Sequence, residues 1–172
     1  MIESTEAILS KIEEGLEELR SYYLKAKEKV FHPLCQKLFE ILAKEKEKHL
    51  ERTREIKASM RRGKSWVVDR WIWDVGEGIP NPLKNLSDLS HLPLCTAEDL
   101  KRLDDAMEKE EKFFYFMDEL TKEASQSLTK RFYLSLAYEG RGYYLLLLET
   151  KDCVAHPDFW QQRIETVFMD GA

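Results

Sequence analysis

Glycine and proline are scarce in this sequence, with 7 and 5 occurrences in 172 residues. So few turn-forming residues do not suit the many tight turns of a sheet protein. Hydrophobic residues make up 43% of the chain and charged residues 34%, a balance that is typical of long amphipathic helices packed around a shared core. We therefore expect an all-α protein.

Long hydrophobic runs and an excess of positive charge are also missing. The longest apolar run, Tyr143 to Leu148, is far shorter than the about 18 residues of a transmembrane helix. The formal net charge of −5 argues against a nucleic-acid partner. The first residues, MIESTEAILS, lack the basic start and apolar centre of a signal peptide. We expect a cytoplasmic protein with no membrane and no nucleic-acid partner.

Cysteine is limited to Cys35, Cys95 and Cys153, which lie far apart in the sequence and form no C-x-x-C pair. A rubredoxin-type iron site or a zinc ribbon needs paired cysteines, so both are excluded on this chain. Isolated cysteines in a cytoplasmic protein are usually reduced and structural. We expect three free thiols.

What the sequence does contain is helical periodicity, first in two stretches of the N-terminal half. One stretch predicts a helix over residues 5–29 with Ser4 as its N-cap. Pro33 suits the first turn of a second helix, which should end near residue 61. The apolar stripe of the first helix consists of Ile8, Ile12, Leu16, Leu19, Tyr23 and Ala26.

Residues 62–95 differ in composition and predict a long crossover connection. Glycines and prolines are concentrated there, together with Trp66, Trp71 and Trp73. An exposed aromatic cluster of this kind would suit a protein partner. The alternative is that the three tryptophans cover the open side of a helical bundle.

Helical periodicity returns after the crossover. Thr96 predicts the N-cap of a third helix that ends near residue 124. Either Ser125 or Ser127 would cap a fourth helix, which should end near residue 152. The tail, residues 153–172, is expected to contain a short helix over 159–168.

The two helix pairs, residues 5–61 and 96–152, resemble each other. A shift that places Glu14 on Glu108 also matches Leu42 with Leu136, Ala43 with Ala137 and Glu45 with Glu139. The matched core positions indicate a duplicated helix pair. We expect one domain over residues 1–172, a four-helix bundle of two helical hairpins.

Several phrases of the sequence resemble those of rubrerythrin-like proteins in the ferritin-like di-iron family. Phe39-x-x-Leu42-Ala43 and its copy Tyr133-x-x-Leu136-Ala137 are similar to the lead-in of the family's ligand helices. Residues 139–144, EGRGYY, resemble the family's phrase E-E-R-G-H-Y. Residues 156–160 with 169–171 resemble the ending of the branch without rubredoxin. The resemblance covers nearly the whole chain and implies a ferritin-like bundle, a homodimer and di-iron oxidoreductase chemistry.

The family's di-iron site takes one Glu from each of two helices and a Glu-x-x-His from each of the other two. Carried over residue by residue, the single-Glu positions fall on Leu16 and Glu110, and the Glu-x-x-His positions fall on Lys46 with His49 and on Gly140 with Tyr143. Only Glu110 and His49 keep a ligand residue type. Two ligands cannot hold two irons, so we expect no cofactor, with iron on altered ligands as the alternative.

The resemblance therefore implies a degenerate site. We expect the Lys46 ammonium to pair with the Glu110 carboxylate, because an unpaired buried charge is costly. Gly140 should leave a void that faces Lys46, and Tyr143 should donate a hydrogen bond to Glu110. A small molecule in the vacated chamber is a further alternative. Gly142, which the family phrase shares, suggests close approach by another segment.

A metal site shifted by one residue is a weaker alternative. Glu45 and Glu139 lie one position before the family's ligand positions, and Glu17 and Glu111 lie one position beyond them. One residue turns a side chain by about 100° around the helix, so we expect these acids to point away from the core.

These patterns indicate two classes of function. One is a non-catalytic binding or assembly module that has lost the di-iron site. The other is a metal-binding oxidoreductase that handles peroxide or dioxygen with altered ligands. The run Tyr143 to Leu148 is apolar on every helix face, which together with the family favours a homodimer.

Overall fold

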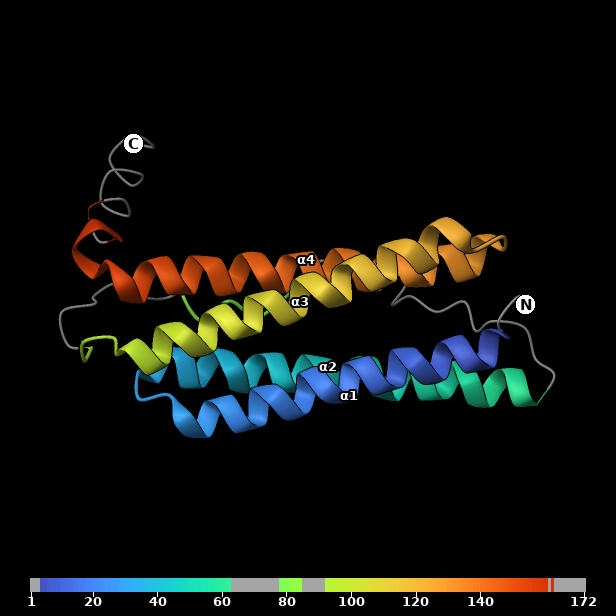
Figure 1. The fold of residues 1–172 in the computed structure, drawn as a ribbon, viewed down its shortest axis with the longest axis horizontal. Coiled ribbons are helices and arrows are strands. Elements are labelled where there is room, and N and C mark those ends of the chain that lie inside the picture. Colours follow the sequence, from blue (N-terminus) through green and yellow to red (C-terminus); the bar gives the residue numbers. More distant parts are fainter. Residues whose placement is uncertain (1–3, 63–77, 85–91, 161, 163–172) are drawn as a thin grey trace.

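The computed structural model describes residues 4–62, 78–84, 92–160 and 162, and these residues form a bundle of four long helices (Figure 1). The helices are α1 (Thr5–Lys29), α2 (Pro33–Arg61), α3 (Ala97–Glu123) and α4 (Ser127–Ala155). The predicted all-α fold is confirmed, and each boundary lies close to the predicted one. Trp66, Trp71 and Trp73 lie outside the described residues, as does most of the predicted tail helix.

The helices are arranged as two hairpins. α1 packs along α2 and α3 packs along α4, and the hairpins meet through α1 with α3 and through α2 with α4 (Figure 1). Neighbouring helices run antiparallel. Since α2 ends and α3 begins at opposite ends of the bundle, the crossover must span its whole length. No described helix combines the length and the apolarity needed to cross a membrane.

Apolar stripes and caps explain why these residues form helices. The predicted α1 stripe is confirmed: Ile12, Leu16 and Tyr23 are completely buried. Ser4 caps α1 by accepting a hydrogen bond from the backbone of Ala7 at 3.3 Å, as predicted. The predicted serine cap of α4 is wrong, because its N-cap is Gln126, which makes no side-chain capping bond.

A buried carboxylate joins the start of α3 to the turn between α1 and α2. Asp99 Oδ1 accepts hydrogen bonds from the backbone N–H groups of Phe31 at 2.7 Å and His32 at 3.1 Å. Its Oδ2 accepts from the Thr96 backbone at 2.8 Å and hydroxyl at 2.7 Å. Burial raises the pKa of Asp99, but the hydrogen bonds from these groups outweigh burial and lower it overall. The charged carboxylate therefore holds the two hairpins together at this end.

The crossover comes close to α4 at Gly142. A Cβ atom added there would lie 2.7 Å from Ile79 Cδ1, which is closer than van der Waals contact allows. The close approach expected from the sequence is thus made by the crossover. A side chain at this position would require the end of Ile79 to shift, which offsets part of the about 1 kcal/mol that alanine gains over glycine in a helix interior.

Replacing Asp99 should weaken the fold and change its acid sensitivity. In Asp99→Asn the side-chain N–H₂ group would face N–H or O–H donors that bind a carboxylate oxygen in the wild type. We therefore expect the free energy of unfolding to fall by about 2–3 kcal/mol. Folding lowers the pKa of Asp99 from its ordinary value of 3.8. Its stabilisation is therefore complete above that value and is lost as the pH falls through the lowered pKa. Urea unfolding between pH 2 and 7 measures both effects.

The matched control is Glu111→Gln on the exposed side of α3. This variant should keep the stability and the acid slope of the wild type. Equal acid slopes for wild type and Asp99→Asn would contradict the role given to the carboxylate.

The contact between Ile79 of the crossover and Gly142 of α4 can be tested by removing a single methyl group. Gly142→Ala should gain little or no stability, because the new methyl group meets Ile79 Cδ1. Ile79→Val removes that atom, so in the Ile79→Val background Gly142→Ala should stabilise by the full helix-propensity gain of about 1 kcal/mol. Gly140→Ala is the control, since its Cβ would have an ordinary contact at 3.6 Å. Its effect on the midpoint of urea unfolding should be the same in both backgrounds. Equal effects of Gly142→Ala in the two backgrounds would rule out the contact.

Candidate functional site

A buried ion pair lies at the centre of the bundle. Lys46, near the middle of α2, places its Nζ atom 2.8 Å from Oε1 and 3.0 Å from Oε2 of Glu110 on α3. The exposed fraction is 1% for the lysine side chain and 0% for the glutamate side chain. The pair predicted from the sequence is therefore present. Two charges removed from water at this depth must compensate each other.

Aromatic rings complete the environment of the ammonium group. Lys46 Nζ lies 4.4 Å from the ring centroid of Tyr143 on α4 and 5.5 Å from that of Phe113 on α3. The negative face of an aromatic ring attracts a cation, most strongly where water is excluded. The positive charge is thus balanced by a carboxylate and by two ring faces.

The hydroxyl group that binds Glu110 belongs to Tyr23 on α1. Its Oη donates a short hydrogen bond to Glu110 Oε1. The sequence-based prediction named Tyr143 as this donor and was wrong, because Tyr143 instead presents its ring to Lys46. Burial, followed by the charge of Glu110, raises the pKa of Tyr23 well above its ordinary value. Tyr23 therefore stays protonated and available as a donor.

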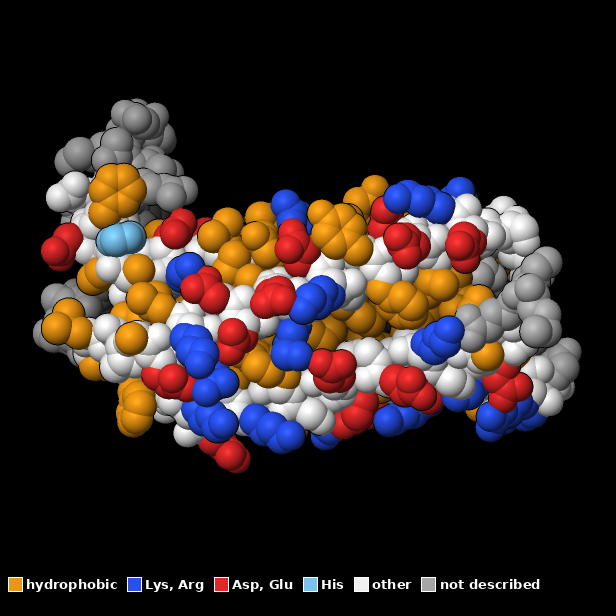
Figure 2. All heavy atoms as spheres, viewed as in Figure 1, with side chains coloured by type: hydrophobic (Ala, Val, Ile, Leu, Met, Phe, Trp, Pro, Cys, Tyr) orange, Lys and Arg blue, Asp and Glu red, His pale blue; other side chains and the backbone are white. Residues whose placement is uncertain are grey.

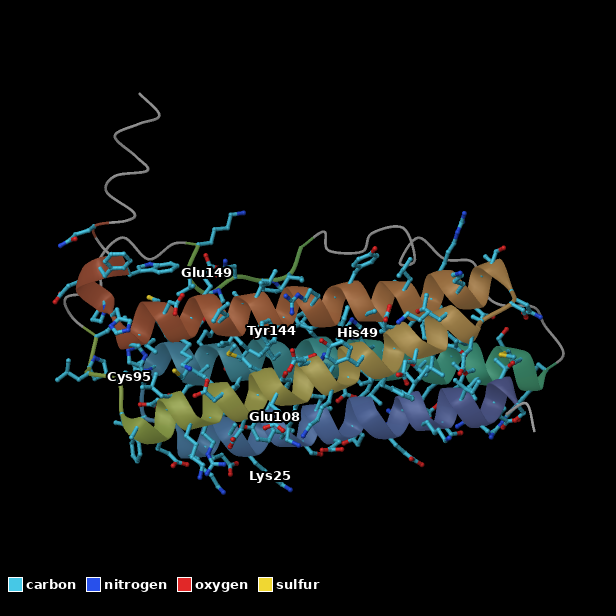
Figure 3. All side chains as sticks on the ribbon, turned by 45° about the horizontal axis from the view of Figure 1, so that its top comes forward. Lys25, His49, Cys95, Glu108, Tyr144 and Glu149 are labelled. Atoms are coloured by element: carbon cyan, nitrogen blue, oxygen red, sulfur yellow. The ribbon has the colours of Figure 1, made fainter. Side chains whose placement is uncertain are left out.

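A second buried contact lies beside the first, near the middle of the bundle (Figure 3). His49 Nε2 on α2 meets Glu139 Oε2 on α4 at ion-pair distance. The expectation that Glu139 points away from the core was wrong, since only 8% of the residue is exposed. The imidazole lies 6.0 Å from the Tyr143 ring, measured between centroids. Tyr143 thus neighbours both pairs, and burial and the nearby carboxylates raise its pKa strongly.

Gly140 faces the carboxylate of the central pair. A Cβ atom added to Gly140 would lie 3.6 Å from Glu110 Oε2. The predicted void facing Lys46 was therefore wrong, because the Glu110 carboxylate occupies the space beside the glycine. There is room for a methyl group at this position.

The other positions that the sequence analysis considered as metal ligands do not all lie at the centre of the bundle. Leu16 is completely buried within the apolar stripe of α1. Glu17 is 45% exposed, as expected for an acid that points away from the core. Glu111 is exposed as well. The structure therefore brings together Lys46, Glu110 and Gly140, and it excludes these two acids from the centre.

The donor set of the central cluster does not fit a di-iron site. Among the residues that the structure describes, no group of three or more His, Cys, Asp or Glu side chains is placed to hold a metal ion. A protonated lysine has no lone pair to offer a metal. The Glu110 carboxylate is already bound by Lys46 and Tyr23.

The three cysteines come together at one end of the bundle, where Cys95 precedes α3 (Figure 3). All three are free, as predicted from the sequence. Burial, with a smaller effect of the Asp99 charge, raises the pKa of Cys35 to about 12 and of Cys95 to about 11. Burial and the charge of Glu149 raise the pKa of Cys153 to about 11. Because the thiolate is the reactive form, these thiols are suited to packing and not to chemistry.

Two residues of the cluster were not identified from the sequence. Tyr23 lies in the apolar stripe of α1, where a tyrosine reads as ordinary core. Only its contact with Glu110, which the structure shows, identifies Tyr23 as part of the cluster. Glu139 could have been found through His49, because a buried histidine needs a hydrogen-bond partner and the facing helix carries an acid at the matching height.

Comparisons of the sequence with protein-family models and with curated proteins, and a comparison with solved structures, found no match. The function has therefore to be inferred from the geometry of the buried cluster.

The energetic role of the central pair can be measured by substitution. Lys46→Met keeps the shape but leaves Glu110 buried without its cation, so we expect a loss of about 3–5 kcal/mol. The triple variant Tyr23→Phe, Lys46→Met, Glu110→Leu removes all three polar partners together. It should recover most of that loss, because uncharged groups need no compensation. Urea unfolding followed by circular dichroism gives the free energies.

The exposed pair of Lys112 and Glu108 on α3 provides the control, since both side chains are more than half exposed. Lys112→Met should leave the free energy of unfolding nearly unchanged, because water solvates both charges of this pair. A similarly small cost for Lys46→Met would show that the central pair is not buried in solution.

Proposed function

We propose that this chain is a ferritin-like protein related to the rubrerythrins that has lost its di-iron site. In this proposal the bundle serves as a non-catalytic binding or assembly module. The observation that carries the proposal is the Lys46 ammonium, which lies at the centre of the bundle in contact with Glu110.

The physical argument is one of charge. A di-iron site binds two cations with an excess of carboxylates that face the metal. Here one of the family's carboxylate positions holds a cation, and that cation neutralises the remaining carboxylate. A metal ion would have to displace Lys46 and leave its charge buried without a partner, at a cost of several kcal/mol. The cluster supports a stable core more than a catalytic centre.

The alternative proposal is a metal-dependent oxidoreductase that uses altered ligands. One observation favours it: His49 and Glu139, two residue types that bind iron, meet inside the bundle. Iron on these residues together with Glu110 would require Lys46 to move aside. The two proposals differ in metal content, which is directly measurable.

Metal content is therefore the first test. After expression with added iron, inductively coupled plasma mass spectrometry should find close to zero iron per folded chain. Near two irons per chain, with an optical absorption band after aerobic purification, would support the oxidoreductase and overturn the assembly module. A circular dichroism spectrum confirms that the chain is folded in either case.

One substitution tests whether the cluster descends from a metal site. Lys46→Glu recreates the Glu-x-x-His spacing with His49 and adds a carboxylate to Glu110 and Glu139. We expect this variant to bind manganese or iron and to gain thermal stability when either metal is added. Lys46→Met, which supplies no ligand, should show no such gain. No metal-dependent gain for Lys46→Glu would count against the proposed ancestry.

A further inference from the structure

One end of the bundle carries three protruding hydrophobic side chains. Phe31 lies in the turn between α1 and α2, Leu94 precedes α3 and Phe159 follows α4. Their exposed fractions are 72%, 88% and 67%, the three highest among the large hydrophobic residues that the structure describes. Figure 2 shows hydrophobic side chains that stand out at the left end of the molecule, where Figure 1 places the end of α1 and the start of α3. Exposed hydrophobic side chains that gather in one place mark an interaction site.

The three segments that present these side chains adjoin one another. Asp99 of α3 accepts a hydrogen bond from the backbone N–H of Phe31 at 2.7 Å, which joins the turn to α3. Leu94 and Pro157 line one hollow together, so the segment before α3 lies beside the segment after α4. That hollow has a volume of about 30 Å³, which is space for a few water molecules. The hydrophobic side chains therefore stand out from a filled surface and do not surround a pocket.

Exposed lysines surround the same end of the bundle. Within the described part of the chain these lysines have no ion-pair partner, and each lies at most four residues, or about 6 Å, from the end of its helix. The exposed acids at the same level that also lack an ion pair among the described residues are Glu28, Asp152 and Asp158. The lysines outnumber these acids, although the whole chain has a net charge of −5. The lysines are Lys25, Lys29, Lys37 and Lys101.

We propose that this end of the bundle docks on the surface of a phospholipid bilayer. Phe31, Leu94 and Phe159 insert between the acyl chains, where their hydrophobic surface is removed from water. The lysines, about one helical turn behind them, lie at the level of the lipid phosphate groups. Anionic headgroups attract positive side chains that lie close to the membrane. The bundle thus stands on the bilayer with one end.

The shape and the charge of this end select lipid over a protein partner. A protein interface packs as densely as a protein interior, so it needs hollows into which the side chains of the partner fit. A bilayer is fluid and closes around protruding side chains whatever their spacing. Lysine beside phenylalanine and leucine suits this boundary, because its aliphatic part stays with the acyl chains while its ammonium group reaches the phosphates.

This proposal revises the expectation that the protein has no membrane partner. That expectation rested on the missing transmembrane helix, and a protein that lies on a bilayer needs no such helix. The proposal is independent of the proposed function, because the protruding residues lie on the surface and the pair of Lys46 and Glu110 is buried at the centre of the bundle.

Co-sedimentation with lipid vesicles tests the proposal. The wild-type protein should bind phosphatidylcholine vesicles, and bind them more tightly when they also contain phosphatidylserine. Phe31→Ser, Leu94→Ser and Phe159→Ser should each lower the partition coefficient at least about fivefold, because each removes one inserted side chain. The control is the double variant Tyr138→Ser, Leu145→Ser, which changes side chains on α4 that are 60% and 50% exposed and should bind like the wild type. Circular dichroism confirms that each variant is folded.

The lysines have a separate readout. Lys29→Glu together with Lys101→Glu should remove the preference for phosphatidylserine and leave binding to phosphatidylcholine within about twofold of the wild type. Lys112→Glu together with Lys122→Glu changes the net charge equally on another part of α3 and should keep the preference.

A wild-type protein that stays in the supernatant with both kinds of vesicle overturns the proposal. So does a Tyr138→Ser, Leu145→Ser variant that loses as much binding as the variants at the end of the bundle. Self-association that the end variants abolish, with no binding to vesicles, would make this end an interface between proteins and would overturn the proposal as well.

Discussion

The structure depends on a positive charge placed where a helical bundle has almost no water to solvate it. Lys46 is tolerated because Glu110 lies in direct contact and because ring faces cover the rest of the ammonium group. Tyr23 satisfies the carboxylate from a third helix, and Gly140 leaves room for it from the fourth. Since all four helices contribute, sliding any one of them along the bundle would leave a buried charge or hydroxyl without its partner. The pair therefore constrains the packing of the whole molecule.

The two halves of the chain match each other in sequence, but at the centre of the bundle they carry complementary side chains. Equivalent positions of the repeat hold Lys46 and Gly140, Leu16 and Glu110, and His49 and Tyr143. A large side chain is matched with a small one, and an apolar residue with a charged one. A symmetric set of carboxylates would suit two cations of a metal site, whereas this asymmetric set satisfies itself.

The surface follows a different principle from the core. Inside, opposite charges pair within one chain because no solvent is available to them. On the outer face of α4 the charges are exposed and lie in separate halves, next to apolar side chains. Water can solvate such charges, so nothing forces them to pair within the chain. They remain exposed to solvent along this face.

The sequence by itself determined the four helices, their lengths and the residues of the core stripes, because amphipathic periodicity and caps such as Thr96 act over a few neighbouring residues. The meeting of Lys46 and Glu110 was predicted only from the resemblance to the ligand positions of rubrerythrin-like proteins, and the structure confirms the contact. Only the tertiary structure decided that Tyr23 binds Glu110, that Glu139 turns inward to His49, and that Ile79 covers Gly142. These contacts join residues far apart in the chain. They depend on how each helix is rotated about its own axis, which a one-dimensional pattern leaves open.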